Sequence, residues 1–329
     1  MVLVRAVARA FGSEGRVIRV GAYAYFRKQV VPLEDAKVGI MTHALNYGTG
    51  CFEGIRGNWN QQLEQICLFR MPEHYRRLKQ SAKMLRIEIP ESVDELCDIT
   101  VDLVRRSGYQ EDVYIRPLAY KSQEVIGVRL HDVQDDVNIF VAPFGAYLDA
   151  EAGVRCCTSS WQRVPDVAIP SLAKATGKYL NSAIAKTEAW ERGFDEAIML
   201  THAGMVSEGS GENIFIVTGD RLVTPDPSQD ILIGITRSTV IELARTELGI
   251  ETVERAIPRS ELYAADECFM TGTAAHLSPV IEVDRIPIAD GKTGPVTRKL
   301  MDLYYDIIRG KVARYSDWST PVSVTPVTA

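Results

Sequence analysis

The sequence lacks the features that mark secreted, membrane-spanning and nucleic-acid-binding proteins. Its 329 residues include only six cysteines and no C-x-x-C pair, which argues against a disulfide scaffold and indicates a reduced, cytoplasmic compartment. No run approaches the roughly 18 consecutive apolar residues of a membrane-spanning helix, and the first residues contain no clear signal-peptide core. The formal net charge of -6 disfavours a nucleic-acid partner.

Common catalytic motifs are missing too. No two of the five histidines are four residues apart, so the H-E-x-x-H metal motif is absent. The segment 291–293 ends like a phosphate-binding loop, but Ile286 stands where the first glycine of that motif is required. The segment 209–211 begins like a dinucleotide fingerprint, but Ile214 replaces the third glycine. The chemistry must therefore come from another arrangement.

Length and patterning indicate two domains of mixed secondary structure. At about 150 residues per domain, the chain is long enough for two. Strand-like and helix-like segments alternate without an internal repeat, which predicts an α/β (α+β) fold. A connector at 143–153 separates a first domain, 1–142, from a second, 154–315, and the Ser/Thr/Pro/Val-rich tail at 316–329 is expected to be flexible.

Apolar periodicity and turn residues place the individual elements. Ser92 followed by Glu95 forms a capping box, which opens a helix that stops at Gly108. Further helices are predicted at 72–87, 179–192, 236–249 and 296–309. Strands are predicted within 17–31, 112–121, 137–142, 154–160, 196–201, 213–218 and 267–271, and 202–212 is expected to form a loop.

Two residues suit chemistry on a pyridine ring. Lys174 lies among small residues, where partial desolvation favours the neutral amine that Schiff-base formation needs. Taken alone, a solvated loop lysine is the simpler interpretation. Glu208 lies in the glycine-rich turn 207–213, where a carboxylate can hold a pyridinium proton. The alternative there is an ordinary acidic hairpin loop.

Two further segments offer backbone N–H groups to an anion. Gly234-Ile235-Thr236-Arg237 opens a helix whose N-terminus suits a phosphate. Plain helix capping by Thr236 is the alternative. The segment 272–275 follows a strand and adds donors for a carboxylate. A Schiff-base lysine, a pyridinium carboxylate and a phosphate cradle are the three parts of a pyridoxal phosphate site, although spacing alone does not bring them together.

A different reading starts from Ser171-x-x-Lys174. With Tyr179-x-Asn181 and the Lys-Thr-Gly at 292–294, it matches the short motifs of penicillin-binding serine acyl-transferases, in which a lysine activates a serine nucleophile. Ser171 and Tyr179 are only eight residues apart, too close to come from the separate elements that such a site needs. This acyl-enzyme remains a distant alternative.

The chain resembles the branched-chain amino-acid aminotransferases, which are class IV pyridoxal-phosphate enzymes. The resemblance extends from about residue 22 to residue 309, in the family's order. Its motifs are 45–48, 51–56, 114–118, 173–175, 207–213, 234–237 and 272–275. It implies a small N-terminal domain and a larger C-terminal domain with pyridoxal 5′-phosphate between them, and a homodimer or a multiple of dimers.

The resemblance also implies the reaction and the cofactor ligands. It implies ping-pong transamination of leucine, isoleucine and valine with 2-oxoglutarate, through a Schiff base on Lys174. Tyr179 would contact the phenolic oxygen of the cofactor, and Glu208 its ring nitrogen. The phosphate would be held by Arg77, Ile235, Thr236 and Thr273. For Arg77 the alternative is a solvated helix arginine.

Substrate contacts follow from the same resemblance. It assigns the α-carboxylate to Tyr114, Thr273 and Ala274, and the second carboxylate of glutamate or 2-oxoglutarate to Arg116. The side-chain pocket would be lined by Tyr47, Phe52, Phe144 and Tyr147, with Gly54 in the same substrate-binding segment. For the aromatic residues the alternative is core packing. An apolar cage with an arginine at its edge accepts both an alkyl chain and a carboxylate.

Three positions depart from the family pattern. His276 stands where many relatives have glutamate, and Phe144 where tryptophan is common; both affect the expected substrate range. Lys178, where a small or amide residue is usual, adds a charge near Lys174. The sibling activities with D-amino acids or (R)-amines remain alternatives within the same fold.

Overall fold

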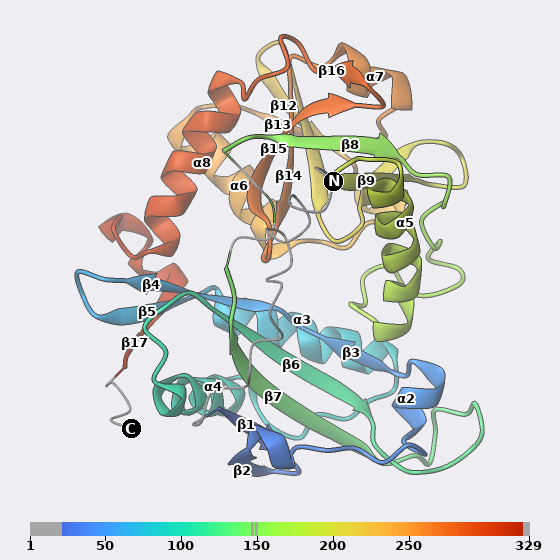
Figure 1. Cartoon of the computed structure of the whole chain (residues 1–329), viewed down its shortest axis with the longest axis vertical. Coiled ribbons are helices and arrows are strands. Elements are labelled where there is room, and N and C mark those ends of the chain that lie inside the picture. Colours follow the sequence, from blue (N-terminus) through green and yellow to red (C-terminus); the bar gives the residue numbers. More distant parts are fainter. Residues whose placement is uncertain (1–21, 146–147, 149–150, 325–329) are drawn as a thin grey trace, which may run out of the picture.

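The computed structural model describes residues 22–145, 148 and 151–324. These residues form two β-sheets with helices packed against them (Figure 1). One sheet is built mainly from the N-terminal half of the chain and the other from the C-terminal half. The mixed α/β fold class is therefore confirmed. The division into domains at 143–153 stays a prediction.

The first sheet is antiparallel, with strand order β17-β5-β4-β6-β7-β1-β2 and β3 paired to β6. Helix α2 (His43–Tyr47) precedes β3, and α3 (Met71–Met84) and α4 (Val93–Ser107) pack against the sheet. Its strands are β1 (Tyr23–Phe26), β2 (Gln29–Pro32), β3 (Gly50–Phe52), β4 (Ile55–Asn60), β5 (Gln65–Phe69), β6 (Val113–Lys121), β7 (Asp135–Pro143) and β17 (Ser319–Ser323).

Local sequence explains the two large helices on this sheet. In α4, Ser92 Oγ accepts from the Glu95 N–H at 3.1 Å, and the Glu95 carboxylate accepts from the Ser92 N–H at 2.7 Å. The predicted capping box is thus confirmed, and Gly108 ends the helix at φ 61°, where glycine avoids a Cβ clash. In α3, Tyr75 and Leu78 are fully buried against the sheet, as their helical spacing predicts.

The second sheet has the order β10-β9-β8-β15-β14-β11-β12-β13, with β16 paired to β15. Helix α5 (Tyr179–Glu191) packs on β9, and α6 (Ile235–Glu247) and α8 (Pro295–Ile308) pack on β14; α7 is Arg259–Ala264. The strands are β8 (Val154–Thr158), β9 (Glu196–Leu200), β10 (Val206–Gly209), β11 (Asn213–Thr218), β12 (Arg221–Thr224), β13 (Thr252–Glu254), β14 (Glu267–Gly272), β15 (His276–Val283) and β16 (Ile286–Pro287).

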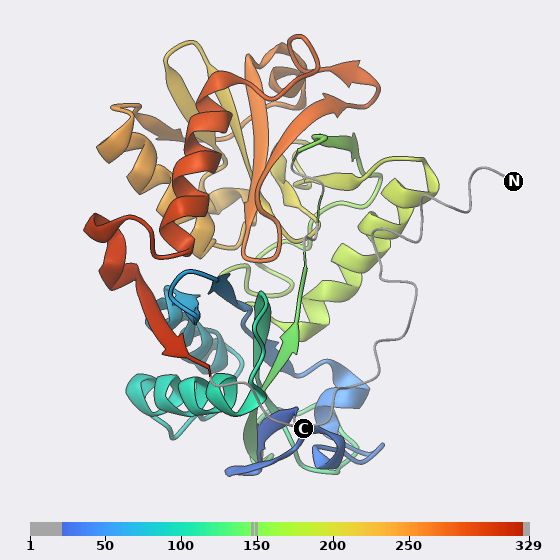
Figure 2. The same ribbon diagram turned by 60° about the vertical axis from the view of Figure 1, so that its left-hand side comes forward.

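The C-terminal tail corrects a prediction. Residues 319–323, expected in an irregular tail, form β17, which pairs with β5 at the edge of the first sheet. Val322 lies opposite Ile66 and is 1% exposed. The chain therefore leaves α8 on the second sheet and returns to the first (Figure 2). Short polar segments become strands when a neighbouring edge supplies the pairing, which composition alone did not reveal.

Two further local predictions were wrong. Residues 206–209, expected in a loop, form β10 and pair with β9, so that Glu208 lies on a strand. Helix α6 begins after Gly234, and the Thr236 side chain makes no capping hydrogen bond. Both corrections bear on the site, because they fix the positions from which Glu208 and Thr236 face the pocket.

Candidate active site

The side chains predicted to bind a cofactor lie in one pocket beside α3 and the second sheet. It is lined by residues from α3, α5, β10, the start of α6 and the turn between β14 and β15. All seven residues to which the family resemblance gives a cofactor contact line this one pocket, namely Arg77, Lys174, Tyr179, Glu208, Ile235, Thr236 and Thr273. The fold therefore brings these residues together, which their spacing in the sequence alone could not establish.

Lys174 is fixed at the pocket by its backbone and its amine. Its carbonyl accepts from the Phe52 N–H at 3.1 Å, and its own N–H donates to Ser81 Oγ at 3.1 Å. The Lys174 Nζ donates to the Tyr179 hydroxyl at 2.6 Å and lies 5.1 Å from the centre of the Phe52 ring. The amine thus has one strong polar partner and an apolar wall, a setting that suits a nucleophilic lysine.

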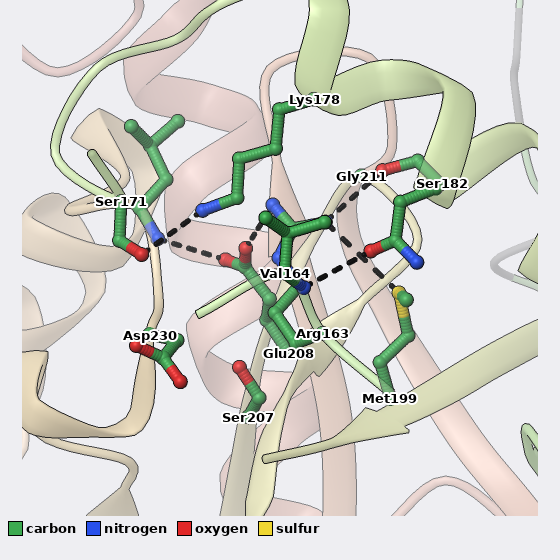
Figure 3. Close-up of polar contacts among 12 residues, drawn as sticks. Arg163, Val164, Ser171, Lys178, Ser182, Met199, Ser207, Glu208, Gly211 and Asp230 are labelled. Atoms are coloured by element: carbon green, nitrogen blue, oxygen red, sulfur yellow. Dashed lines mark hydrogen bonds and ion pairs between the residues drawn. The ribbon is translucent and has the colours of Figure 1, made fainter. Parts of the chain in front are cut away.

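Glu208 is buried and held from three sides. Its Oε2 accepts from Asn213 Nδ2 and from the Leu232 N–H, each at 3.1 Å. Arg163 Nη2 lies 2.6 Å from its Oε1, and both side chains are about 5% exposed (6% and 5%) (Figure 3). Two donors and a guanidinium fix the position of the carboxylate and compensate its burial.

The start of α6 forms the anion-binding end of the pocket. Ile235 and Thr236 occupy its first turn, where backbone N–H groups have no partner within the helix. A Cβ at Gly234 would collide with Asn213 Oδ1, so only glycine lets the chain pass Asn213 into the helix. The helix dipole and these N–H groups favour a phosphate.

Arg77 points to the same end because Glu53 holds it there. Arg77 Nε and Nη2 donate to the two Glu53 oxygens at 2.6 and 2.9 Å, and Nη1 donates to the Ile233 carbonyl at 2.7 Å. His74 Nδ1 lies 2.6 Å from the Glu53 carboxylate. Burial alone raises the pKa of Glu53, but Arg77 and His74 together hold that pKa well below its usual range.

A second group of aromatic and basic side chains adjoins Lys174. The Phe52 ring packs against Tyr179 with centroids 4.7 Å apart, and the Arg116 guanidinium lies 4.3 Å above Phe52. Arg116 Nη2 donates to the Tyr114 hydroxyl at 3.2 Å, and the ring of Tyr114 lies 5.1 Å from that of Phe144. These four predicted substrate residues form one chain of contacts that reaches the lysine.

Gly54 belongs to this group through its missing side chain. A Cβ at Gly54 would collide with the hydroxyl of Tyr114. Thr273 lines the pocket, and Ala274 follows it in the turn between β14 and β15. The structure thus places Tyr114 on β6, and Thr273 and Ala274 together in the turn between β14 and β15.

Of the other predicted substrate residues, Tyr47 lies apart from this group. Tyr47 does not line the Lys174 pocket; it ends α2, and its hydroxyl accepts from the Gly127 N–H at 3.1 Å. Tyr147 lies outside the described residues. The roles of both stay predictions.

Comparison with known proteins decides the family. The family model described as class IV amino-transferases matches residues 50–283. The chain belongs to this family. It is 48% identical, over 91% of this chain and 96% of the relative, to a probable branched-chain-amino-acid aminotransferase of Aquifex aeolicus, and 41% identical, over 92% and 97%, to the branched-chain-amino-acid aminotransferase of Escherichia coli strain K12.

Solved structures agree with this class IV assignment. The branched-chain aminotransferase of Thermoproteus uzoniensis, solved with norvaline, superimposes with a TM-score of 0.87 at 46% identity, covering 92% of this chain and 99% of that one. The branched-chain amino acid aminotransferase of Thermobaculum terrenum, solved in its PLP-form, has a TM-score of 0.86 at 39% identity and coverages of 91% and 97%.

The pocket of this class IV aminotransferase fits a phosphopyridine. It offers an amine, a carboxylate, and a helix N-terminus beside an arginine, which are the groups that an aldehyde, a ring nitrogen and a phosphate require. Among the described residues, the Thr271 hydroxyl at the pocket wall is buried without a hydrogen-bond partner. Neither Gly211 nor Gly272 has a Cβ to narrow the wall.

The serine acyl-transferase reading is overturned. Lys174 donates to Tyr179, whereas Ser171 accepts from Lys178 at 3.1 Å. Ser171 does not line the pocket that holds Lys174, and its hydroxyl is not hydrogen-bonded to the Lys174 amine. The S-x-x-K pattern is therefore coincidental.

Sequence reasoning missed Arg163 and Glu53. Each pairs with a residue far along the chain, Arg163 with Glu208 and Glu53 with Arg77, and neither lies in a motif that predicts an ion pair.

No described helix is long and apolar enough to cross a membrane. Within the described ranges, no group of His, Cys, Asp and Glu side chains is arranged to hold a metal ion.

Proposed function

We propose that this protein is a pyridoxal 5′-phosphate-dependent aminotransferase that transfers the amino group of leucine, isoleucine and valine to 2-oxoglutarate. The observation that carries the proposal is the convergence of Lys174, Glu208 and the N-terminus of α6 in one pocket. Relatives that are 41–48% identical and carry the branched-chain aminotransferase name support it. The bound cofactor supplies the electron sink that stabilises a carbanion at the substrate α-carbon.

Lys174 and Tyr179 are assigned to proton transfer. The Lys174 amine would bind the cofactor covalently and, once displaced by the amino acid, would carry the proton from the substrate α-carbon to the C4′ carbon of the cofactor. The Tyr179 hydroxyl, 2.6 Å from that amine, orients it. Because both half-reactions would use the same pocket, the first keto acid would leave before 2-oxoglutarate binds, with the amino group kept on the bound cofactor, and this gives a ping-pong order.

The remaining cofactor contacts are assigned by chemistry. Glu208 would accept a hydrogen bond from the protonated ring nitrogen, since its carboxylate is fixed by Arg163 and Asn213. The phosphate would be held by backbone N–H groups of α6 and by Arg77, Ile235, Thr236 and Thr273.

Substrate selection is assigned to the group next to Lys174. Phe52 and Phe144 offer apolar surface to a branched side chain, and Arg116, half-buried between Phe52 and Tyr114, offers a guanidinium to the second carboxylate of 2-oxoglutarate. Tyr114, Thr273 and Ala274 are assigned to the α-carboxylate, with Gly54 giving the Tyr114 hydroxyl its space.

We further propose a homodimer or a multiple of dimers. Tyr47 is separate from the Lys174 pocket of its own chain, and nearby apolar residues are exposed, including Ile40 at 85% and Leu45 at 62%. A second copy placed over this face would bury them. Sedimentation velocity of the holoenzyme tests the assembly; a monomer would contradict it.

All six cysteines are free thiols, which supports a cytoplasmic location.

The absorption spectrum of the holoenzyme tests the function. L-Leucine should bleach the yellow colour of the cofactor, and 2-oxoglutarate should restore it, because the two half-reactions are separable in a ping-pong enzyme. Bleaching by a D-amino acid or by (R)-1-phenylethylamine but not by L-leucine would instead assign a sibling activity. As a control, Lys83→Ala, which replaces an exposed lysine, should show the same two colour changes as the wild type.

A further inference from the structure

A cluster of buried polar side chains lies behind Glu208. It comprises Lys178, Arg163 and Ser171, and we call it the rear cluster. Lys178 is the last residue of the short 3₁₀ turn Thr176–Lys178, four positions after Lys174, and it is 2% exposed. Figure 3 shows its side chain pointing into the protein, toward Ser171 and beside the Arg163–Glu208 pair. A lysine buried to this degree requires an explanation, because burial of an ammonium is costly.

Lys178 has only a weak compensating partner. Its Nζ donates to Ser171 Oγ at 3.1 Å. Within residues 22–145, 148 and 151–324, no carboxylate lies within ion-pair distance of Lys178; the Glu208 carboxylate is paired with Arg163. Arg163 therefore makes the direct ion pair with Glu208, and the Lys178 amine lies in the same cluster without a carboxylate in contact.

The surrounding charges act on Lys178 from several elements. Burial has the largest effect, followed by repulsion from Arg163, and together they lower the pKa of Lys178 to about 8. Glu208, Asp230 and Asp166 oppose this shift. Asp166 accepts from the Ser171 N–H at 2.7 Å, and its own N–H donates to Asp230 at 2.9 Å. Lys178 can thus exist in two charge states near neutral pH.

We propose that Lys178 is a positioning residue that acts through Glu208 and sets how firmly the ring nitrogen of the cofactor keeps its proton. A charged Lys178 near Glu208 partly offsets the negative charge of the carboxylate, so the pKa of the ring nitrogen falls. A neutral Lys178 leaves that negative charge at full strength, so the pKa of the ring nitrogen rises. The two protons, on Lys178 and on the ring nitrogen, then oppose each other. The inference rests on the proposed contact between Glu208 and that nitrogen.

Nuclear magnetic resonance of the holoenzyme tests this coupling directly. With a cofactor labelled with ¹⁵N in the ring, the nitrogen shift reports the protonation of that atom. In the wild type we expect a step near pH 8, where Lys178 titrates. The step should be absent from Lys178→Met, and also from Lys178→Gln, whose amide keeps a donor for Ser171 but carries no charge.

Two comparisons separate charge from packing. Ser171→Ala removes the acceptor of the ammonium, so the step should move to lower pH without disappearing. Lys178→Met and Lys178→Gln differ in polarity but both lack the charge, so both should give the same flat nitrogen shift. Circular dichroism confirms that each variant is folded, and Lys178→Gln decides the question if the methionine variant is not.

Several results would overturn the inference. A nitrogen shift that is flat from pH 7 to 9 in the wild type contradicts it, as does a step that all variants share. A step lost in Ser171→Ala but kept in Lys178→Gln would assign the effect to the hydrogen bond rather than to the charge. A protein that forms no coloured complex with the cofactor refutes the proposed function as well, whereas a coloured protein without the step refutes only this inference.

Discussion

Replacing Glu53 tests how the anion end of the pocket is built. Glu53 is fully buried, and its two oxygens hold Arg77 Nε and Nη2 at 2.6 and 2.9 Å and His74 Nδ1 at 2.6 Å. Glu53→Gln keeps the volume but removes the charge that compensates a guanidinium whose side chain is 11% exposed. Breaking a buried ion pair on one side costs about 3–5 kcal/mol, and the retained amide oxygen places the expected loss near the lower bound.

The same substitution should weaken cofactor binding. Arg77 loses the charge of Glu53 and one of the two oxygen acceptors that aim it past Ile233 at the start of α6. Each 1.4 kcal/mol of lost binding free energy is about a tenfold rise in Kd, and we expect a rise of about tenfold or more for pyridoxal phosphate. Urea unfolding of the apoprotein and titration with the cofactor measure the two effects. The exposed Glu251→Gln is the matched control.

The lowered pKa of Glu53 also predicts how folding stability depends on pH. The pKa of Glu53 is lower in the folded protein than in the unfolded chain, so the folded state binds fewer protons. The stabilisation is complete above the unfolded value of about 4.3 and is lost as the pH falls below it. Glu53→Gln should therefore flatten the acid limb of the stability curve. A variant that loses less than about 1 kcal/mol and binds cofactor normally would refute the anchoring of Arg77 by Glu53.

Two other substitutions test separate parts of the structure. Gly54→Ala places a Cβ against the Tyr114 hydroxyl, so the KM for L-leucine should rise at least about tenfold while cofactor affinity is unchanged; an unchanged KM would remove Tyr114 from the substrate contacts. Val322→Ala in β17 should cost about 2 kcal/mol in urea unfolding, because Val322 is 1% exposed opposite Ile66; no loss would indicate a tail that is frayed in solution.

Local chemistry made much of the pocket predictable. Lys174, Glu208 and the Gly234 helix start each lie in a short segment whose residue types suit one group of the cofactor. Arg163 and Glu53 could not be predicted in the same way, because an ion pair between distant segments leaves no spacing signal. Their positions follow from strand pairing and helix packing, which sequence patterns describe only coarsely.

Secondary structure followed the same division. The capping box of α4 was predicted because both partners lie within four residues. Strands β10 and β17 were not, since four or five polar residues form a strand only when a neighbouring edge pairs with them. Glycine and serine around Glu208 resembled a loop for that reason, although its strand position fixes where the carboxylate points.

The central claim is that Lys174 carries the cofactor, and peptide mapping tests it most directly. Borohydride makes the bond between pyridoxal phosphate and its lysine permanent, and mass spectrometry of the digested protein then locates the added mass. We predict the phosphopyridoxyl mass on Lys174, with none in Lys174→Ala. The mass on Lys178, four residues away and buried beside Ser171, or on no lysine at all, would contradict the account.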